Sequence, residues 1–278
     1  MRSIEFYGQV GSGKSPVAQV ARRLLVEAGF EPIDMKTALH RCLERSRLAS
    51  LVTTFMPDRF CYPVAKAVYR RALYPLYSLR LALLKPGLVS AVIRAQLGNG
   101  LPWWHKRQIW RLFFNQENGL VFVSSRLAED EILLLEEGPL HRAVNLFSWQ
   151  MDGIRAGLVR QYLAHLPELD LAVRVEAPLD QCQARMLARG LPSRLEPKGD
   201  ETTTVFFENA GQIVALISSH VAASGRPAIV VDNGGERGHF EAALAAALSR
   251  ALPALSRLAS RPAQARTEDH YPDDYAII

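Results

Sequence analysis

Short apolar segments recur along the chain and predict buried strands. Each one is bounded by glycine, proline or an acidic residue, and each is too short for a typical helix. Runs of this kind are typical of a parallel sheet whose two faces are both covered. The predicted strands span residues 3–7, 32–35, 131–137, 170–176 and 228–232.

Helical segments alternate with these strands and predict the class of the fold. They span residues 17–28, 141–165, 179–188, 204–223 and 238–251. Strands that alternate with helices imply parallel pairing through right-handed crossovers. We therefore expect an α/β fold, a three-layer sandwich around a five-stranded parallel sheet.

The connection between the second and third strands is far longer than a crossover needs. Proline and glycine divide it into several helical stretches, so we expect a helical insertion at residues 37–118. The predicted domain spans residues 1–250 with this insertion inside it. Residues 251–278, rich in proline, arginine and alanine and then acidic, are expected to form a flexible tail.

A complete phosphate-binding motif follows the first strand. The segment Gly8-Gln9-Val10-Gly11-Ser12-Gly13-Lys14-Ser15 matches G-x-x-x-x-G-K-[ST] and leads into a predicted helix. Glycines let backbone N–H groups approach phosphate oxygens, and the helix N-terminus adds positive charge. Lys14 would reach the β- and γ-phosphates, and Ser15 would ligate Mg²⁺. The motif predicts a P-loop NTPase that holds a nucleoside triphosphate and Mg²⁺ with Gly8, Gly11, Ser12, Gly13, Lys14 and Ser15, and we expect the triphosphate to be ATP.

Charge is distributed unevenly. Residues 41–118 hold thirteen Lys and Arg against three acids, a net charge of +10, whereas the rest of the chain carries −5. The basic segment is also rich in leucine and aromatic residues. Such a segment favours an anionic partner, although a helical subdomain with a solvated basic face would show the same pattern.

Two further stretches resemble the P-loop nucleoside and nucleotide kinase superfamily. The first runs from Leu133 to Arg142 and the second from Val173 to Gly190, ending in Arg-Gly. The resemblance covers about 1–36 and 119–250 and leaves out the basic insertion. It implies a kinase, a phosphotransferase whose lid closes over the nucleotide and excludes water.

The resemblance also implies roles for particular residues. Glu137 would act as base on an acceptor hydroxyl, and Glu136 would hold the Mg²⁺ water shell. Because consecutive strand residues point to opposite faces, we expect only one of these two acids to face the phosphates. Arg189 and Arg194 would clamp the transferring phosphoryl group. Arg142 and Arg185 would bind substrate, although either could instead be an ordinary surface arginine.

Other classes of P-loop protein stay open. The guanine-binding Asn-Lys-x-Asp and the transporter-type Leu-Ser-Gly-Gly-Gln are absent. A P-loop ATPase or GTPase that acts as a switch or motor on a protein or membrane partner is the main alternative to a kinase. A sulfotransferase is disfavoured by the Lys-Ser ending of the loop. No motif distinguishes ATP from GTP.

The basic insertion shapes the expected partners and location. We expect a small or lipid-linked anionic acceptor, and an anionic membrane surface as a second partner, while nucleic acid is not expected. The three cysteines form no Cys-x-x-Cys pair, and neither a cleavable signal nor a long uncharged apolar stretch is found. We therefore expect a cytoplasmic protein, with the inner face of a membrane as a peripheral location.

Overall fold

The computed structural model describes residues 2–45, 67, 74–98, 101–124, 126–128, 131–150, 152–167, 169–189, 199–235 and 237–259. Its centre is a sheet of five parallel strands in the order β2-β3-β1-β4-β5. The strands are β1 (Arg2–Gly8), β2 (Glu31–Asp34), β3 (Glu131–Leu135), β4 (Leu171–Glu176) and β5 (Ala228–Asp232). The predicted five-stranded parallel sheet is confirmed.

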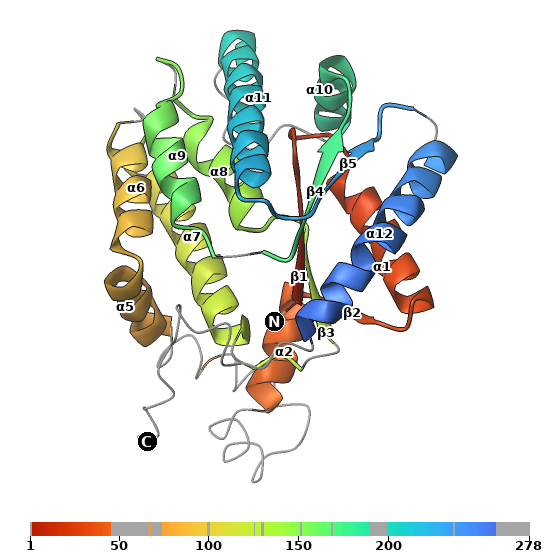
Figure 1. The fold of residues 1–278 in the computed structure, drawn as a ribbon. Coiled ribbons are helices and arrows are strands. Elements are labelled where there is room, and N and C mark those ends of the chain that lie inside the picture. The colour runs from red at the N-terminus through yellow and green to blue at the C-terminus, as the bar shows by residue number, and fades with distance from the viewer. Residues whose placement is uncertain are drawn as a thin grey trace.

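Helices cover both faces of the sheet (Figure 1). One face carries α1 (Lys14–Glu27) and α12 (Arg237–Ala259). The other carries α2 (Met35–Glu44), α7 (Trp103–Ser124), α8 (Pro139–Phe147) and α11 (Gly199–Ala223), with α9 (Ala156–Ala164) packed outside. Because side chains alternate along a strand, Phe6 enters the first layer and Tyr7 the second, and both are buried. The three-layer prediction is therefore confirmed.

The insertion lies on the same face as α8 and α9. Besides α2 and α7 it contains α5 (Tyr74–Leu84) and α6 (Pro86–Leu97), which meet at an angle of 99°. Tyr77 of α5 packs edge-on against Phe122 of α7. Among the described residues no single helix is long and apolar enough to cross a membrane; α5 and α6 together have the length and composition, but they are bent.

Several predicted boundaries are wrong, and α11, for example, begins at Gly199 rather than at residue 204. The helix expected at residues 141–165 is two helices, because side chains of Ser148 and Trp149 bond to α8 carbonyls and Gln150 accepts from the N–H of Arg155. The strand expected to reach residue 137 ends at Leu135, and Glu136 and Glu137 form a turn. Helix α12 continues through Pro253 to Ala259, beyond the expected end at residue 251.

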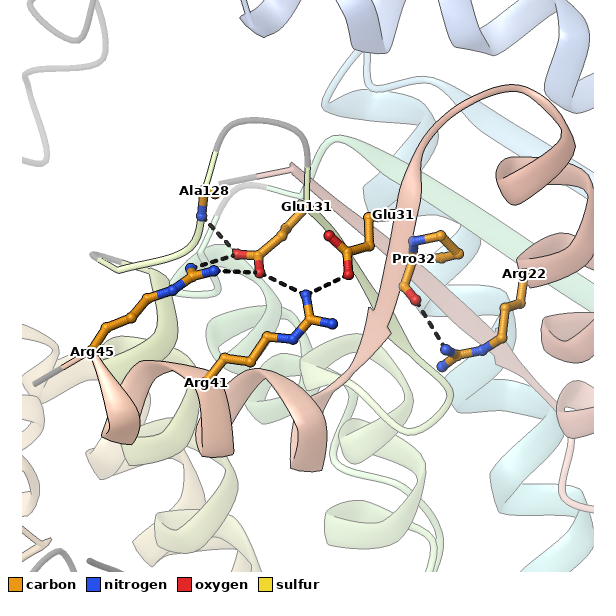
Figure 2. A network of polar contacts seen from close by, with 7 residues as sticks. All are labelled: Arg22, Glu31, Pro32, Arg41, Arg45, Ala128 and Glu131. Carbon is orange, nitrogen blue, oxygen red and sulfur yellow. Dashed lines mark hydrogen bonds and ion pairs between the residues drawn. The ribbon is translucent and has the colours of Figure 1, made fainter. Parts of the chain in front are cut away.

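Ion pairs hold α2 against the amino-terminal edge of the sheet (Figure 2). Glu131, the first residue of β3, is 1% exposed and accepts from Arg41 at 3.0 Å and from Arg45 at 3.1 Å. The N–H of Ala128 donates to the same carboxylate at 2.8 Å. Arg41 also contacts Glu31 of β2, so both oxygens of Glu131 and both arginines are paired at this edge.

Candidate nucleotide and phosphoryl-transfer site

The phosphate loop, residues 8–15, lies at the carboxyl end of β1 and opens α1, as predicted. Gly11 and Gly13 have φ of +84° and +87°, a region that favours glycine. A Cβ on Gly11 would lie 2.2 Å from the carbonyl oxygen of Cys182, and one on Gly13 would lie 2.1 Å from Nδ2 of Asn233. Backbone conformation and close packing therefore both require these glycines.

The loop after β5 supports the phosphate loop. Asn233 donates from Nδ2 to the carbonyl oxygen of Ser12 at 2.8 Å, and its own N–H donates to the carbonyl oxygen of Glu176 at 2.7 Å. Arg185 of α10 (Leu179–Ala188) donates to the carbonyl oxygen of Asn233 at 3.0 Å and to that of Ser12 at 3.5 Å. Sequence reasoning missed Asn233, whose only signal is its place directly after a strand. Arg185 holds the loop here, and its substrate contact stays a prediction.

Lys14 is buried with its ammonium group inside the loop. The side chain is 9% exposed, and Nζ donates to the carbonyl oxygen of Gln9 at 3.2 Å. Burial lowers the pKa of Lys14 to about 8, against the opposing charge of Glu137. Among the described residues, the acids near Lys14 do not offset its desolvation, and the charge of a bound phosphate would do so.

Oxygen donors near Lys14 fit a magnesium ion. Ser15 is exposed in the first turn of α1, and Glu136 and Glu137 are exposed in the turn after β3. In the described part of the chain, no three His, Cys, Asp or Glu residues gather to hold a metal by themselves. Mg²⁺ usually takes one or two protein oxygens together with phosphates and water, so this donor set fits the ion.

The acidic turn after β3 lies near Lys14. The charges of Glu137 and, more weakly, Glu136 both act on the lysine, and which of the two acids faces the phosphates stays a prediction. Alternation along a strand does not apply, because both acids lie in a turn. The carbonyl oxygen of Glu137 accepts from the side chain of Gln116 and from Arg142. Helix α7 of the insertion thus helps to hold the acidic turn.

A buried carboxyl that sequence reasoning missed anchors the same turn. Glu5 of β1 is fully buried, and its Oε1 accepts the N–H of His141 at 2.9 Å. A Cβ on Gly138 would lie 2.5 Å from Cδ of Glu5, so the carboxyl packs directly against the start of α8. Burial raises the pKa of Glu5 well above its usual value. Its only sequence signal was one acid within an apolar strand.

Glu5 belongs to a buried polar layer from β1, α7 and α8. Glu117 of α7 is 3% exposed, and burial raises its pKa to about 7 in spite of Arg142 and Lys85. Arg142 is itself buried, which removes the alternative of a surface arginine. Within the described residues, Glu5 Oε2, Glu117 Oε1, His141 Nδ1 and Arg142 Nε have no hydrogen-bond partner. Native proteins rarely leave such groups unpaired, so this layer is the strongest candidate for contact with an acceptor.

The predicted lid is described only at its start. Arg189 caps the end of α10, is exposed, and its charge acts on Lys14. Arg194 lies outside the described residues. The clamping role of both arginines stays a prediction.

A cleft of about 570 Å³ lies beside the phosphate loop. Its lining includes Gln9, Arg174, Glu176, Leu179, Phe207 and Asp232. Gln9 connects the phosphate loop to α11, because its side chain donates to the carbonyl oxygen of Phe207 at 2.8 Å. Because β3 and β4 flank β1 on opposite sides, the acidic turn and this cleft lie to opposite sides of the loop.

Comparison with known proteins identifies similar solved structures only. No family model matches the chain, and no curated protein matches it. A structure of deoxyadenosine kinase from M. mycoides with bound dCTP is 13% identical, with a TM-score of 0.41, and covers 89% of this chain and 99% of its own. The same kinase with dATP is 14% identical, with a TM-score of 0.41, and covers 90% and 100%. TT1252 from Thermus thermophilus is 20% identical, with a TM-score of 0.33, and covers 90% and 97%.

Proposed function

We propose that this protein is an ATP-dependent phosphotransferase that moves the γ-phosphoryl group to a hydroxyl or phosphate of an anionic acceptor, either small or lipid-linked. The observation that carries the proposal is the electrostatic interaction between Lys14 and Glu137. A desolvated lysine inside a complete phosphate loop lies within electrostatic reach of an exposed carboxylate in the turn after the neighbouring strand β3. A phosphate-binding cation opposite a potential base is the arrangement that transfer to an acceptor requires.

The two sides of the loop suit the two substrates. The cleft on the β4 side offers volume for the nucleoside part of ATP, next to Gln9. The β3 side offers the acidic turn and, beneath it, the buried layer of Glu5, Glu117 and Arg142. We assign the nucleotide to the first side and the acceptor to the second.

The chemistry needs positioning and charge stabilisation more than covalent catalysis. Lys14 and the loop N–H groups would bind and orient the phosphates, and Glu137 would take the proton of an acceptor hydroxyl. Arg189 would approach the phosphoryl group from the end of α10. Mg²⁺ on Ser15 and the acidic turn would supply additional neutralisation of the phosphate charge.

Charge supports an anionic acceptor. Within residues 74–118, which border the acidic turn through Gln116, six basic residues accompany one acid: Arg80, Lys85, Arg94, Lys106, Arg107 and Arg111 against the buried Glu117. A surface of this kind attracts anions and raises their rate of encounter.

An acceptor panel tests the proposal. ADP release from Mg·ATP would be measured with nucleosides, nucleoside monophosphates, sugar phosphates and phospholipid acceptors. At least one acceptor should raise the rate, and Lys14→Ala should lower the stimulated rate by about 100-fold or more. Lys36→Ala, an exposed lysine on α2, is the matched control and should leave it unchanged. Turnover that no acceptor stimulates would contradict the proposal and favour an ATPase or GTPase that acts on a protein or membrane partner.

A further inference from the structure

An exposed apolar rim, which the proposed function does not explain, lies where α6 ends and α7 begins. It consists of Leu97, Trp103 and Trp104, whose exposed fractions are 76%, 75% and 59%. Large apolar side chains this exposed, and close together in the chain, are typical of an interaction site. None of the three takes part in the phosphate loop, the acidic turn or the buried polar layer.

The rim lies at the same end of the molecule as the phosphate loop. Gly98, at the end of α6, packs against Arg155 at the start of α9, and Gly87 at the other end of α6 packs against His165. Helix α9 leads to the amino-terminal end of β4. The first residue of α9 therefore lies toward the carboxyl-terminal ends of the strands. The phosphate loop lies at that edge too (Figure 1).

Basic residues accompany the rim on α6 and α7, where the sequence has no nearby acid, and at the start of α9, where Asp152 precedes Arg155 by three residues. Arg94, Arg107 and Arg155 are exposed, and Lys106 is half-buried. Between residues 74 and 116 the sequence contains no Asp or Glu. A protein partner would have to supply all of the negative charge, whereas an anionic bilayer presents such charge over its whole surface.

We propose that the rim of Leu97, Trp103 and Trp104 docks this protein onto an anionic lipid membrane, with the phosphate-loop end toward the bilayer. Tryptophan favours the headgroup level of a bilayer, where its ring is buried and its N–H stays solvated. Leu97 adds apolar area, and the surrounding arginines contact the lipid phosphates. The proposal goes beyond phosphoryl transfer and does not depend on it.

Vesicle co-sedimentation of the full chain, without nucleotide, tests the docking. We expect binding to vesicles containing phosphatidylserine or phosphatidylglycerol at low salt, weaker binding at high salt, and weak binding to pure phosphatidylcholine. The double variant Trp103→Ala/Trp104→Ala should reduce the partition coefficient at least 10-fold. The charge variant Arg94→Glu/Arg107→Glu should lower binding to anionic vesicles only. Val26→Ser, 57% exposed on α1, is the matched control and should bind as the wild type does.

A second readout separates docking from misfolding and from self-association. The tryptophan emission should shift to the blue when anionic vesicles are added, and this shift should be lost in the double tryptophan variant. Circular dichroism melts should show that the variants are folded. Absence of binding at low salt, binding that rim variants leave unchanged, or concentration-dependent dimerisation abolished by the double variant would each overturn the proposal. Because no nucleotide is used, such a failure would leave the phosphotransferase proposal unaffected.

Discussion

Two buried glutamates in adjacent strands have opposite surroundings. Glu131 opens β3 at the amino-terminal edge of the sheet, where Arg41, Arg45 and the N–H of Ala128 satisfy both of its oxygens (Figure 2). Glu5 lies beside Leu135 near the other edge, where it accepts one N–H at 2.9 Å and keeps Oε2 unpaired. The same side chain is fully matched at one end of the sheet and unmatched at the other.

The pKa shifts follow this difference. Although burial opposes ionisation of Glu131, hydrogen bonds from Arg45, Ala128 and Arg41 lower its pKa. For Glu5, burial prevails and raises the pKa well above its usual value. The paired charges of Glu131, Arg41 and Arg45 hold α2 against the sheet. Unpaired buried groups cost stability, and proteins mostly retain them where function requires them.

The largest effect is expected at the unmatched end, in the acidic turn. Glu137→Gln removes the proposed base and should lower acceptor-dependent turnover by about 10² to 10⁴-fold while ATP binding is retained. Glu136→Gln, one residue away and equally exposed, should have a smaller effect. Steady-state kinetics and nucleotide titration of both variants would check this. Equal turnover of Glu137→Gln and the wild type would remove the base assignment.

Glu117 should make the folded state less stable as pH rises. The unfolded carboxyl loses its proton near pH 4.5, whereas the folded one keeps it to about pH 7, so folding binds a proton between these values. Stability should therefore fall from pH 4.5 to pH 7 by up to about 3 kcal/mol and then level off. In Glu117→Gln this loss should disappear, as urea unfolding across that range would measure. Parallel pH profiles for the wild type and the variant would contradict the shift.

The stability that Glu131 contributes at the amino-terminal edge of the sheet should have the opposite pH dependence. Because the pKa of Glu131 is lowered in the folded state, its stabilisation is present above the unfolded pKa and is lost as pH falls through the folded one. Glu131→Gln should cost about 2 kcal/mol at neutral pH, without changing the turnover per folded molecule. Glu31→Gln, which breaks only a half-exposed pair with Arg41, should cost less than about 1 kcal/mol. Equal urea midpoints for the two variants would contradict the comparison.

The smallest effect on stability is expected at the start of α2, the helix that positions Arg41 and Arg45. Asp34 caps α2 by accepting the N–H of Thr37 at 2.8 Å. Asp34→Ala should destabilise the protein by about 1 kcal/mol, and Asp34→Asn, which can still accept this bond, should cost little. Thermal melts would distinguish the two variants. A loss of the same size in both would point to the ion pair with Arg22 rather than to the cap.

Local patterns were sufficient for the strands and the phosphate loop. The strand at residues 228–232 and the helix at residues 179–188 agree with β5 and α10. Their apolar runs and turn residues act within a few positions, so the sequence displays them directly. The break between α8 and α9 was missed because it depends on side chains that bond back to the main chain, which periodicity does not reveal.

The site was predicted where a motif defines it and missed where distant segments meet. Glu5 appears in the sequence as one acid in an apolar strand, and its partner His141 lies 136 residues away. Glu117 appears as one of three acids in a basic insertion, although packing buries it and raises its pKa. The side chain of Asn233 acquires its role only by donating to the carbonyl oxygen of Ser12, 221 residues away.

The sequence by itself determined the alternation of strands and helices, the phosphate loop and the excess of positive charge in the insertion. These properties depend on neighbouring residues or on simple counts. Only the tertiary structure decided which buried carboxyl is paired and which is not, that Arg142 lies inside the protein, and that the rim of Leu97, Trp103 and Trp104 lies at the same end of the molecule as the phosphate loop. Burial, desolvation and hydrogen bonding between distant residues exist only once the chain has folded.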